Sequence, residues 1–194
     1  RYFPGFYNLI PNGVDIDRFA SLSIEPIARF DDGVINLLYV GRAEKRKGLA
    51  YLLRAFAAVH ARNPDTRLLV VGPNSRARRR YRRMVEEGDQ PGIVFIDDVS
   101  DEELARYYRT AQVFCSPATG NESQGYVLLE AMAASVPVVA SNIDGYASVI
   151  THGVEGSLVR PKDEQQLADA LTSLVRNADA RAAFAAAGRR RVED

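Results

Sequence analysis

The chain has 194 residues, 46% of them hydrophobic, and its 25 basic and 25 acidic side chains cancel to a formal net charge of zero at pH 7. This length and apolar content suit one α/β domain with its own core and leave little for a second complete domain. The balanced charge argues against a protein that is drawn as a whole to nucleic acid or to anionic lipid. The single cysteine, Cys115, excludes an internal disulfide and a cysteine-ligated metal cage.

Short runs rich in β-branched residues alternate with segments of helical period along the chain. In chain order, strands are expected at 36–40, 67–71, 93–96, 112–115, 136–140 and 157–159, with a weaker one at 8–10. Helices are expected at 49–62, 76–87, 101–109, 125–134, 163–176 and about 180–191, with Asp101 and Asp163 as first-turn acids. This alternation predicts a Rossmann-like parallel sheet of about six strands with helices on both faces.

We therefore expect residues 1–194 to form one domain, in which residues 1–30 are partly linker and residues 178–194 form a C-terminal helix. The opening Arg1-Tyr-Phe-Pro-Gly5 has neither an initiator methionine nor the apolar core of a signal peptide, so we expect the chain to be part of a longer protein. No apolar stretch approaches the ~20 residues that cross a bilayer. With one cysteine and no export signal, the expected compartment is the cytoplasm.

A basic loop follows the strand expected at 36–40, namely Gly41-Arg-Ala-Glu-Lys-Arg-Lys-Gly48. Ligands of parallel α/β sheets bind outside the carboxyl ends of the strands, in the loops that lead into helices. Arg42 and Lys47 can reach a shared anion from this loop, and Gly41 lets the backbone approach it closely. The loop does not have the order of a P-loop, and a solvated basic turn is the alternative interpretation.

Two carboxylates, Glu122 and Glu130, follow the strand expected at 112–115. A helix whose first amides come from residues 123–126 would offer unpaired N–H groups and its positive dipole end to a diphosphate. The ligand that suits this arrangement is a sugar nucleotide. One acid would hold its sugar and the other its ribose, because carboxylates accept hydrogen bonds from hydroxyls. The alternatives are a surface acid at Glu122, an exposed helix position at Glu130 and an ordinary turn glycine at Gly125.

The most basic stretch of the chain is Arg76-Ala-Arg-Arg-Arg-Tyr-Arg-Arg83. It could be a nucleic-acid-binding helix, but a solvated helix face is favoured, because acids follow it and stacking aromatics are almost absent. His60 and His152 are far apart and have no residues at metal-ligand spacing, so no metal site is expected. No arrangement of Ser, His and Asp or of Cys and His suggests a nucleophile.

Ordered motifs run along nearly the whole chain: Ile10-Pro-Asn-Gly-Val-Asp-Ile-Asp-Arg-Phe19, Gly41-Arg42 with Lys47-Gly48, Val70-Val-Gly72, Val99-Ser-Asp-Glu-Glu-Leu104, Glu122 to Glu130, Pro137-Val-Val-Ala-Ser141 and Gly153-Val-Glu-Gly-Ser-Leu-Val159. In this order they resemble the C-terminal, donor-binding half of the group 1 (family 4) retaining glycosyltransferases, which have the GT-B architecture. Two stretches, Glu122-Ser-Gln-Gly-Tyr-Val127 and Ser141-Asn-Ile-Asp-Gly145, look like the phosphatidylinositol mannosyltransferase branch of that family.

The resemblance implies a role for each residue of the two motifs described above. Arg42 and Lys47 would neutralise the diphosphate of the donor, which is also the leaving group, and Glu122 would face the transferred sugar; these three are the catalytic candidates. Glu130 would accept from the ribose, and the base would lie at Val99 and Ser100. The complete set of expected donor-site residues is Gly41, Arg42, Lys47, Val99, Ser100, Glu122, Ser123, Gln124, Gly125, Tyr126 and Glu130.

The resemblance thus implies a retaining hexosyltransferase domain that binds a nucleotide-diphospho-sugar, GDP-mannose in particular, for transfer to a lipid or glycan acceptor. It implies no cofactor and no metal. The expected partner is an N-terminal acceptor domain that this chain does not contain, without which it would be inactive. Through that domain the full protein could associate peripherally with the inner membrane face.

Several positions depart from the family pattern and leave the base and sugar of the donor open. Asp97 and Ser135 stand where glycines are usual, Gln124 replaces a frequent aromatic residue, and residues 143–148 lack the usual Gly-Gly-x-x-Glu. A UDP-sugar-dependent glycosyltransferase and half of a sugar-nucleotide 2-epimerase are the alternatives on the same fold. An arginine-rich nucleic-acid-binding module, built on residues 76–83, is the alternative from another class.

Overall fold

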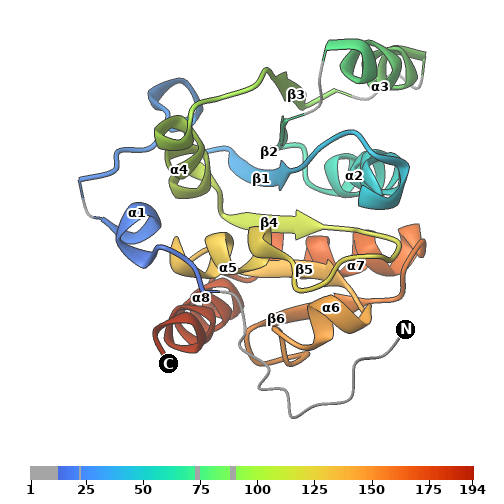
Figure 1. Ribbon diagram of the computed structural model, residues 1–194. Coiled ribbons are helices and arrows are strands. Elements are labelled where there is room, and N and C mark those ends of the chain that lie inside the picture. Colours follow the sequence, from blue (N-terminus) through green and yellow to red (C-terminus); the bar gives the residue numbers. More distant parts are fainter. Residues whose placement is uncertain (1–12, 22, 73–74, 88–90) are drawn as a thin grey trace, which may run out of the picture.

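The computed structural model describes residues 13–21, 23–72, 75–87 and 91–194, and within them it has a six-stranded parallel sheet between two layers of helices (Figure 1). The strands are β1 (Ile35–Val40), β2 (Thr66–Val71), β3 (Ile93–Ile96), β4 (Val113–Ser116), β5 (Val138–Ser141) and β6 (Gly156–Val159). Their order across the sheet is β3-β2-β1-β4-β5-β6. The Rossmann-like fold and its six strands are confirmed; the weaker strand expected at 8–10 lies outside the described residues.

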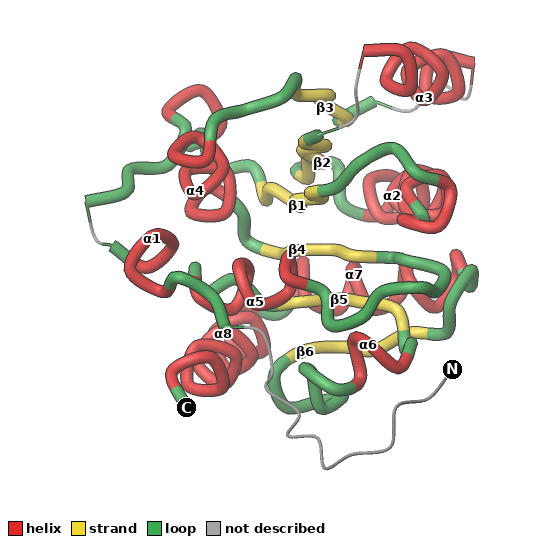
Figure 2. Tube along the Cα trace, viewed as in Figure 1, coloured by secondary structure: helices red, strands yellow, loops and turns green. Residues whose placement is uncertain are grey.

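The helices follow the strands in the expected alternation (Figure 2). The long ones are α2 (Leu49–Arg62), α3 (Ser75–Glu87), α4 (Asp101–Thr110), α5 (Tyr126–Ala133), α7 (Glu164–Arg176) and α8 (Ala178–Glu193). Two short helices, α1 (Ile16–Ala20) and α6 (Asp144–Ala147), and two 3-10 turns, η1 (Ala28–Phe30) and η2 (Lys45–Lys47), were not expected. Elements of three to five residues are too short to show a helical period in the sequence.

The hydrophobic core lies in two layers, one on each face of the sheet. Successive side chains of a strand point to opposite faces, so in β1 Leu38 packs under α1, α4 and α5, whereas Leu37 and Tyr39 pack under α2, α3 and α7. Burial on both faces explains why the strands read as continuous apolar runs. Phe19 of α1 and Phe30 of η1 are both buried in the first layer, so the chain is packed against the sheet well before β1 begins.

Local signals explain where the helices begin. Helix α4 starts with a capping box, in which the Ser100 hydroxyl accepts from the Glu103 amide at 3.2 Å and the Glu103 carboxylate accepts from the Ser100 amide at 3.1 Å. Asp101 is a first-turn acid as expected. Asp163 precedes the first turn of α7 and caps it by accepting from the Gln166 amide at 2.9 Å, so its expected place inside the helix was wrong.

The strand order reverses between β1 and β4, which lie side by side at the centre of the sheet. The loops that follow these two strands therefore meet at the carboxyl edge, where ligands of such sheets bind.

Among the described residues, no helix is both long and apolar enough to cross a membrane.

Candidate functional site

Backbone contacts join the loop after β1 to the loop after β4. The Thr119 amide donates to the Arg46 carbonyl oxygen at 2.7 Å, and the Thr119 hydroxyl lies 3.3 Å from the same oxygen. Gly48 has a φ of +75°, and a Cβ there would lie 1.8 Å from the Pro117 carbonyl oxygen. Only glycine allows this approach, so the two loops are held as one unit.

Glu122 lies where the two loops meet and is held by two cations. One of its carboxylate oxygens, Oε1, is 2.8 Å from Lys47 Nζ and also pairs with Arg46 Nη1. The Glu122 side chain is only 9% exposed, so the carboxylate is nearly buried between these partners. Arg46 Nη1 also donates to the Asn121 carbonyl oxygen at 2.9 Å. The structure thus brings together Glu122 and Lys47, two of the three catalytic candidates.

The third candidate, Arg42, lies at the exposed end of a chain of alternating charges. Its Nη2 is 2.9 Å from Glu44 Oε1, and Glu44 Oε2 is 2.7 Å from Arg46 Nε. The Arg42 side chain is 76% exposed and does not contact Glu122 directly. Desolvation lowers the pKa of Arg46, but the charges of Glu122 and Glu44 outweigh it and leave the pKa raised.

Sequence reasoning did not single out Arg46, although it contacts both acids. The sequence shows three successive basic residues, and only the 3-10 turn η2 determines that two of them, Arg46 and Lys47, point to Glu122. The cluster holds three cations and two carboxylates, and so retains an excess of positive charge at the edge of the sheet.

A cavity of about 470 Å³ opens beside Glu122. It is lined by the β4–α5 loop and by the segment after β5 that leads into α6, including Asn142 and Gly145. A Cβ on Gly145 would lie 1.9 Å from the Glu122 carbonyl oxygen, so this close approach requires glycine. Sequence reasoning missed Asn142 and Gly145; their place directly after β5, at a strand carboxyl end, was the signal that could have found them.

Helix α5 begins later than expected. Gly125 is its N-cap with a φ of +75°, so the first helical amide is that of Tyr126, and Ser123 and Gln124 belong to the preceding loop. A Cβ on Gly125 would lie 2.5 Å from the ring of Tyr146. That ring is fixed in turn by a buried hydrogen bond of 2.7 Å between the hydroxyls of Tyr146 and Ser116. The expected amides therefore come from a loop and a helix end rather than from one helical turn.

Glu130 lies on α5 away from Glu122 and has a neutral partner. The Tyr108 hydroxyl donates to its Oε2 at 2.8 Å. Burial raises the pKa of Glu130, against the lowering effects of that hydrogen bond and of the Arg18 charge. Tyr108 was not expected as a partner of Glu130, because in the sequence it looks like an ordinary core residue of α4.

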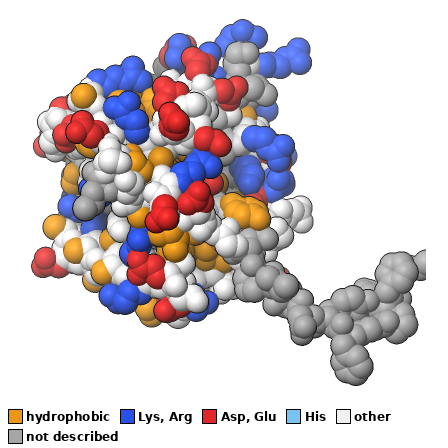
Figure 3. Space-filling model, turned by 60° about the vertical axis from the view of Figure 1, so that its left-hand side comes forward, with side chains coloured by type: hydrophobic (Ala, Val, Ile, Leu, Met, Phe, Trp, Pro, Cys, Tyr) orange, Lys and Arg blue, Asp and Glu red, His pale blue; other side chains and the backbone are white. Residues whose placement is uncertain are grey.

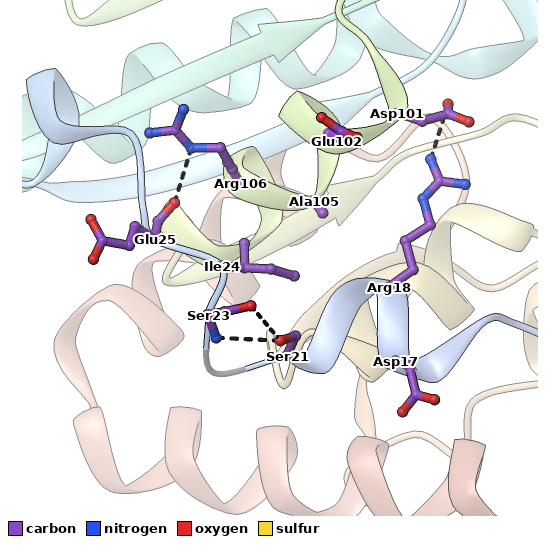
Figure 4. A pocket seen from close by; sticks show the side chains of 10 residues that line it. All are labelled: Asp17, Arg18, Ser21, Ser23, Ile24, Glu25, Asp101, Glu102, Ala105 and Arg106. Atoms are coloured by element: carbon purple, nitrogen blue, oxygen red, sulfur yellow. Dashed lines mark hydrogen bonds and ion pairs between the residues drawn. The ribbon is translucent and has the colours of Figure 1, made fainter.

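Val99 and Ser100 stand at the start of α4, beside a second cavity of about 800 Å³ between α1 and α4. Figure 4 shows Arg18 and Asp101 pointing toward one another across it, at 2.9 Å, and Arg106 donating to the Glu25 carbonyl oxygen at 3.1 Å. None of the expected donor-site residues lines this cavity. The cavity that Glu122 lines is therefore the better candidate for the reacting sugar, although it is the smaller of the two.

Cys115 is fully buried in β4, and burial raises its pKa, so it is not a reactive thiol. Within the described ranges, no group of three or more His, Cys, Asp or Glu side chains is arranged to hold a metal ion.

Comparisons with known proteins show which family this chain resembles. A family model described as "Glycosyl transferases group 1" matches residues 23–191. A phosphatidyl-myo-inositol mannosyltransferase of Mycobacterium leprae is 41% identical over 181 residues, which cover 92% of this chain and 47% of that protein. The chain thus spans about half the length of the curated relatives it matches.

Two solved structures share the fold over almost the whole chain. The C-terminal domain of a group 1 glycosyl transferase from Francisella tularensis is 25% identical with a TM-score of 0.81, and the match covers 93% of this chain and 97% of that one. A sucrose-phosphate synthase from Thermosynechococcus elongatus is 30% identical with a TM-score of 0.81, covering 96% of this chain and 47% of that one.

Proposed function

Because this chain belongs to the group 1 glycosyl transferase family, we propose that it is the donor domain of a retaining hexosyltransferase that uses GDP-mannose. The observation that carries the proposal is the placement of Glu122 and Lys47 at the carboxyl ends of β4 and β1, beside a cavity of about 470 Å³. The choice of GDP-mannose rests on the 41% identity to a mannosyltransferase.

The diphosphate of the donor would bind at the positive cluster. The Lys47 ammonium group lies 2.8 Å from Glu122 Oε1. To bind a phosphate oxygen, it must either contact both groups at once or give up its contact with Glu122. Glu122 keeps Arg46 as a partner when this happens, so its negative charge stays compensated. Arg42, 76% exposed and paired with Glu44, would close over the diphosphate from solvent, and the Tyr126 amide at the start of α5 would supply an uncharged donor.

The sugar and the nucleoside would lie on either side of that diphosphate. Glu122 lines the cavity and would accept from hydroxyls of the transferred sugar, and Asn142 and Gly145 line the same cavity. Glu130 would accept from the ribose through the oxygen that Tyr108 does not occupy. The Ser100 side chain is engaged in capping α4, so the backbone of Val99 and Ser100 would meet the base.

In the reaction, the bond between C1 of the sugar and the diphosphate oxygen breaks, and its electron pair goes to the diphosphate. An acceptor hydroxyl oxygen forms the new bond to C1 with retention of configuration, and its proton passes to the departing diphosphate. Lys47, Arg42 and the amide end of α5 stabilise the charge that develops on the leaving group. Contacts to the acceptor would come from an N-terminal domain, since the chain spans 47% of its mannosyltransferase relative, and the chain alone is expected to turn nothing over.

Isothermal titration of this chain with GDP-mannose, GDP and UDP-glucose tests the proposal. We expect the guanine nucleotides to bind and UDP-glucose to bind more weakly. Lys47→Ala should weaken GDP binding by ~1–3 kcal/mol through loss of a charge-assisted bond, whereas Arg109→Ala, an exposed change on α4, should leave it unaltered. Absence of heat with all three ligands would overturn the donor-site assignment, and preference for UDP-glucose would overturn the mannosyl donor alone.

A further inference from the structure

A second cluster of cations lies on the other side of the β1–α2 loop. A groove of about 480 Å³ runs between α2 and α3, and none of its lining residues lines the cavity beside Glu122. Four basic side chains line it and no acidic one does: Lys45, Arg54, Arg80 and Arg83. Figure 3 shows Lys and Arg side chains gathered at the upper right of the molecule, at the height where Figure 1 draws α3.

Three of these four cations have no carboxylate partner within the described part of the chain. The fourth, Arg54, is paired with Glu164: its Nη2 lies 2.6 Å from Glu164 Oε1, and its guanidinium lies 5.1 Å from the centroid of the Tyr51 ring. Glu44, the acid nearest in sequence to Lys45, is already shared by Arg42 and Arg46. Lys45, Arg80 and Arg83 therefore leave an excess of three positive charges around one groove, which repel one another until an anion binds.

The 3-10 turn η2 explains why the two cation clusters face different ways. Residues of a 3-10 helix are spaced about 120° apart around its axis, so Lys45 and Lys47 project to different sides. Lys47 pairs with Glu122, whereas Lys45 lines the groove. On α3, Arg80 and Arg83 are three positions apart and so share one helix face. That face turns to the groove, whereas Arg79 and Arg82 do not line it.

From this arrangement we propose that the α2–α3 groove binds an organic phosphate at a site separate from the donor site. Guanidinium forks match phosphate oxygens bidentately, and a phosphate dianion compensates the unpaired charge better than a single carboxylate. The floor of the groove includes Tyr51, Met84 and the buried Tyr81, which suits the carbon-bearing part of such a ligand. The phosphate could belong to a small soluble molecule or to a phospholipid headgroup.

Two matched double variants on α3 test the proposal, because all four arginines are exposed and each pair removes the same charge. Both are made in the Lys47→Ala background, which weakens binding at the diphosphate site equally in the two variants. The probes are glycerol 3-phosphate in solution, measured by isothermal titration, and vesicles of equimolar phosphatidylcholine and phosphatidylglycerol, measured by sedimentation. Circular dichroism checks that each variant is folded.

Arg80→Ala with Arg83→Ala should weaken binding of the probe about tenfold or more, whereas Arg79→Ala with Arg82→Ala should change it less than about twofold. Binding of glycerol 3-phosphate would identify a soluble ligand as sufficient, and binding of the vesicles alone would identify a lipid headgroup; either supports the site. Equal losses in the two double variants would indicate a diffuse charge effect, such as that of a nucleic acid along α3, and would overturn the proposal. So would the absence of binding to both probes.

Discussion

Glu122 and Glu130 belong to the same motif, yet they have opposite surroundings. Glu122 is held between two cations, Lys47 and Arg46, that come from the loop after another strand. Glu130 is held by the neutral hydroxyl of Tyr108, and burial raises its pKa. Glu122 is therefore stabilised by ion pairs, whereas Glu130 is stabilised by a hydrogen bond from a neutral group in a poorly solvated place. One motif thus holds two carboxyl groups in opposite electrostatic environments.

The largest expected effect comes from removing the charged partner. Glu122→Ala should lower the free energy of unfolding by about 2 kcal/mol, because it leaves Lys47 and Arg46 close together without their shared carboxylate. The value is below that of a fully buried pair, since the Lys47 and Arg46 side chains are 18% and 31% exposed. Urea denaturation measures it, with Glu86→Ala on the exposed side of α3 as the control, expected within about 0.5 kcal/mol of wild type. A Glu122 variant as stable as that control would mean that the ion pairs contribute nothing.

A smaller effect is expected from the hydroxyl that holds Glu130. Tyr108→Phe should cost about 1 kcal/mol, because it removes the donor at 2.8 Å and leaves a half-buried carboxylate oxygen unpaired. It should also raise the pKa of Glu130 further, since that hydrogen bond lowers it. Tyr107→Phe is the matched control, because its hydroxyl only meets exposed Arg29 at 3.3 Å. If the two variants lose equal stability, the hydrogen bond to Glu130 has no special weight.

The smallest expected effect is a dependence of the free energy of unfolding on pH, which comes from Glu130. Because Glu122→Ala leaves Glu130 in place, that variant should keep this pH dependence. Burial raises the folded pKa of Glu130 above its ordinary value of 4.5, so the folded chain binds this proton more tightly than the unfolded chain. Its contribution to stability is therefore fully present below pH 4.5 and is lost as the pH rises through the folded pKa. Unfolding curves of Glu130→Gln across this window should fall less with rising pH than those of wild type. Parallel curves would show that Glu130 titrates normally.

The elements that the sequence predicts well are those with a long period or a continuous apolar run. Helix α2 has the expected bounds, Leu49–Arg62, because its buried positions recur every three or four residues and Gly48 and Asn63 flank it. Strand β5 begins two residues later than expected, after Pro137, which has no amide hydrogen to donate. Helices α1 and α6 are too short for any period to show.

The candidate site was predictable in its residue types and less so in its contacts. The sequence indicates that acids and cations follow neighbouring strands, but the pairing of Glu122 with Arg46 joins residues 76 positions apart. Which basic residues of η2 contact Glu122 depends on the local turn, and the Tyr108 hydroxyl reaches Glu130 from a different helix. The ligand roles of Arg42, Lys47, Glu122 and the base-binding loop remain predictions.

The contact between Lys47 and Glu122 has a consequence for how binding should respond to ionic strength. An incoming diphosphate does not meet a bare ammonium group but displaces an internal counter-ion, so the electrostatic gain is the difference between two attractions. Added salt screens both of them, and the half-buried internal pair is screened less than exposed charges are. Affinity at this edge of the sheet should therefore fall only gently as salt is added, more gently than the charge of the ligand alone suggests.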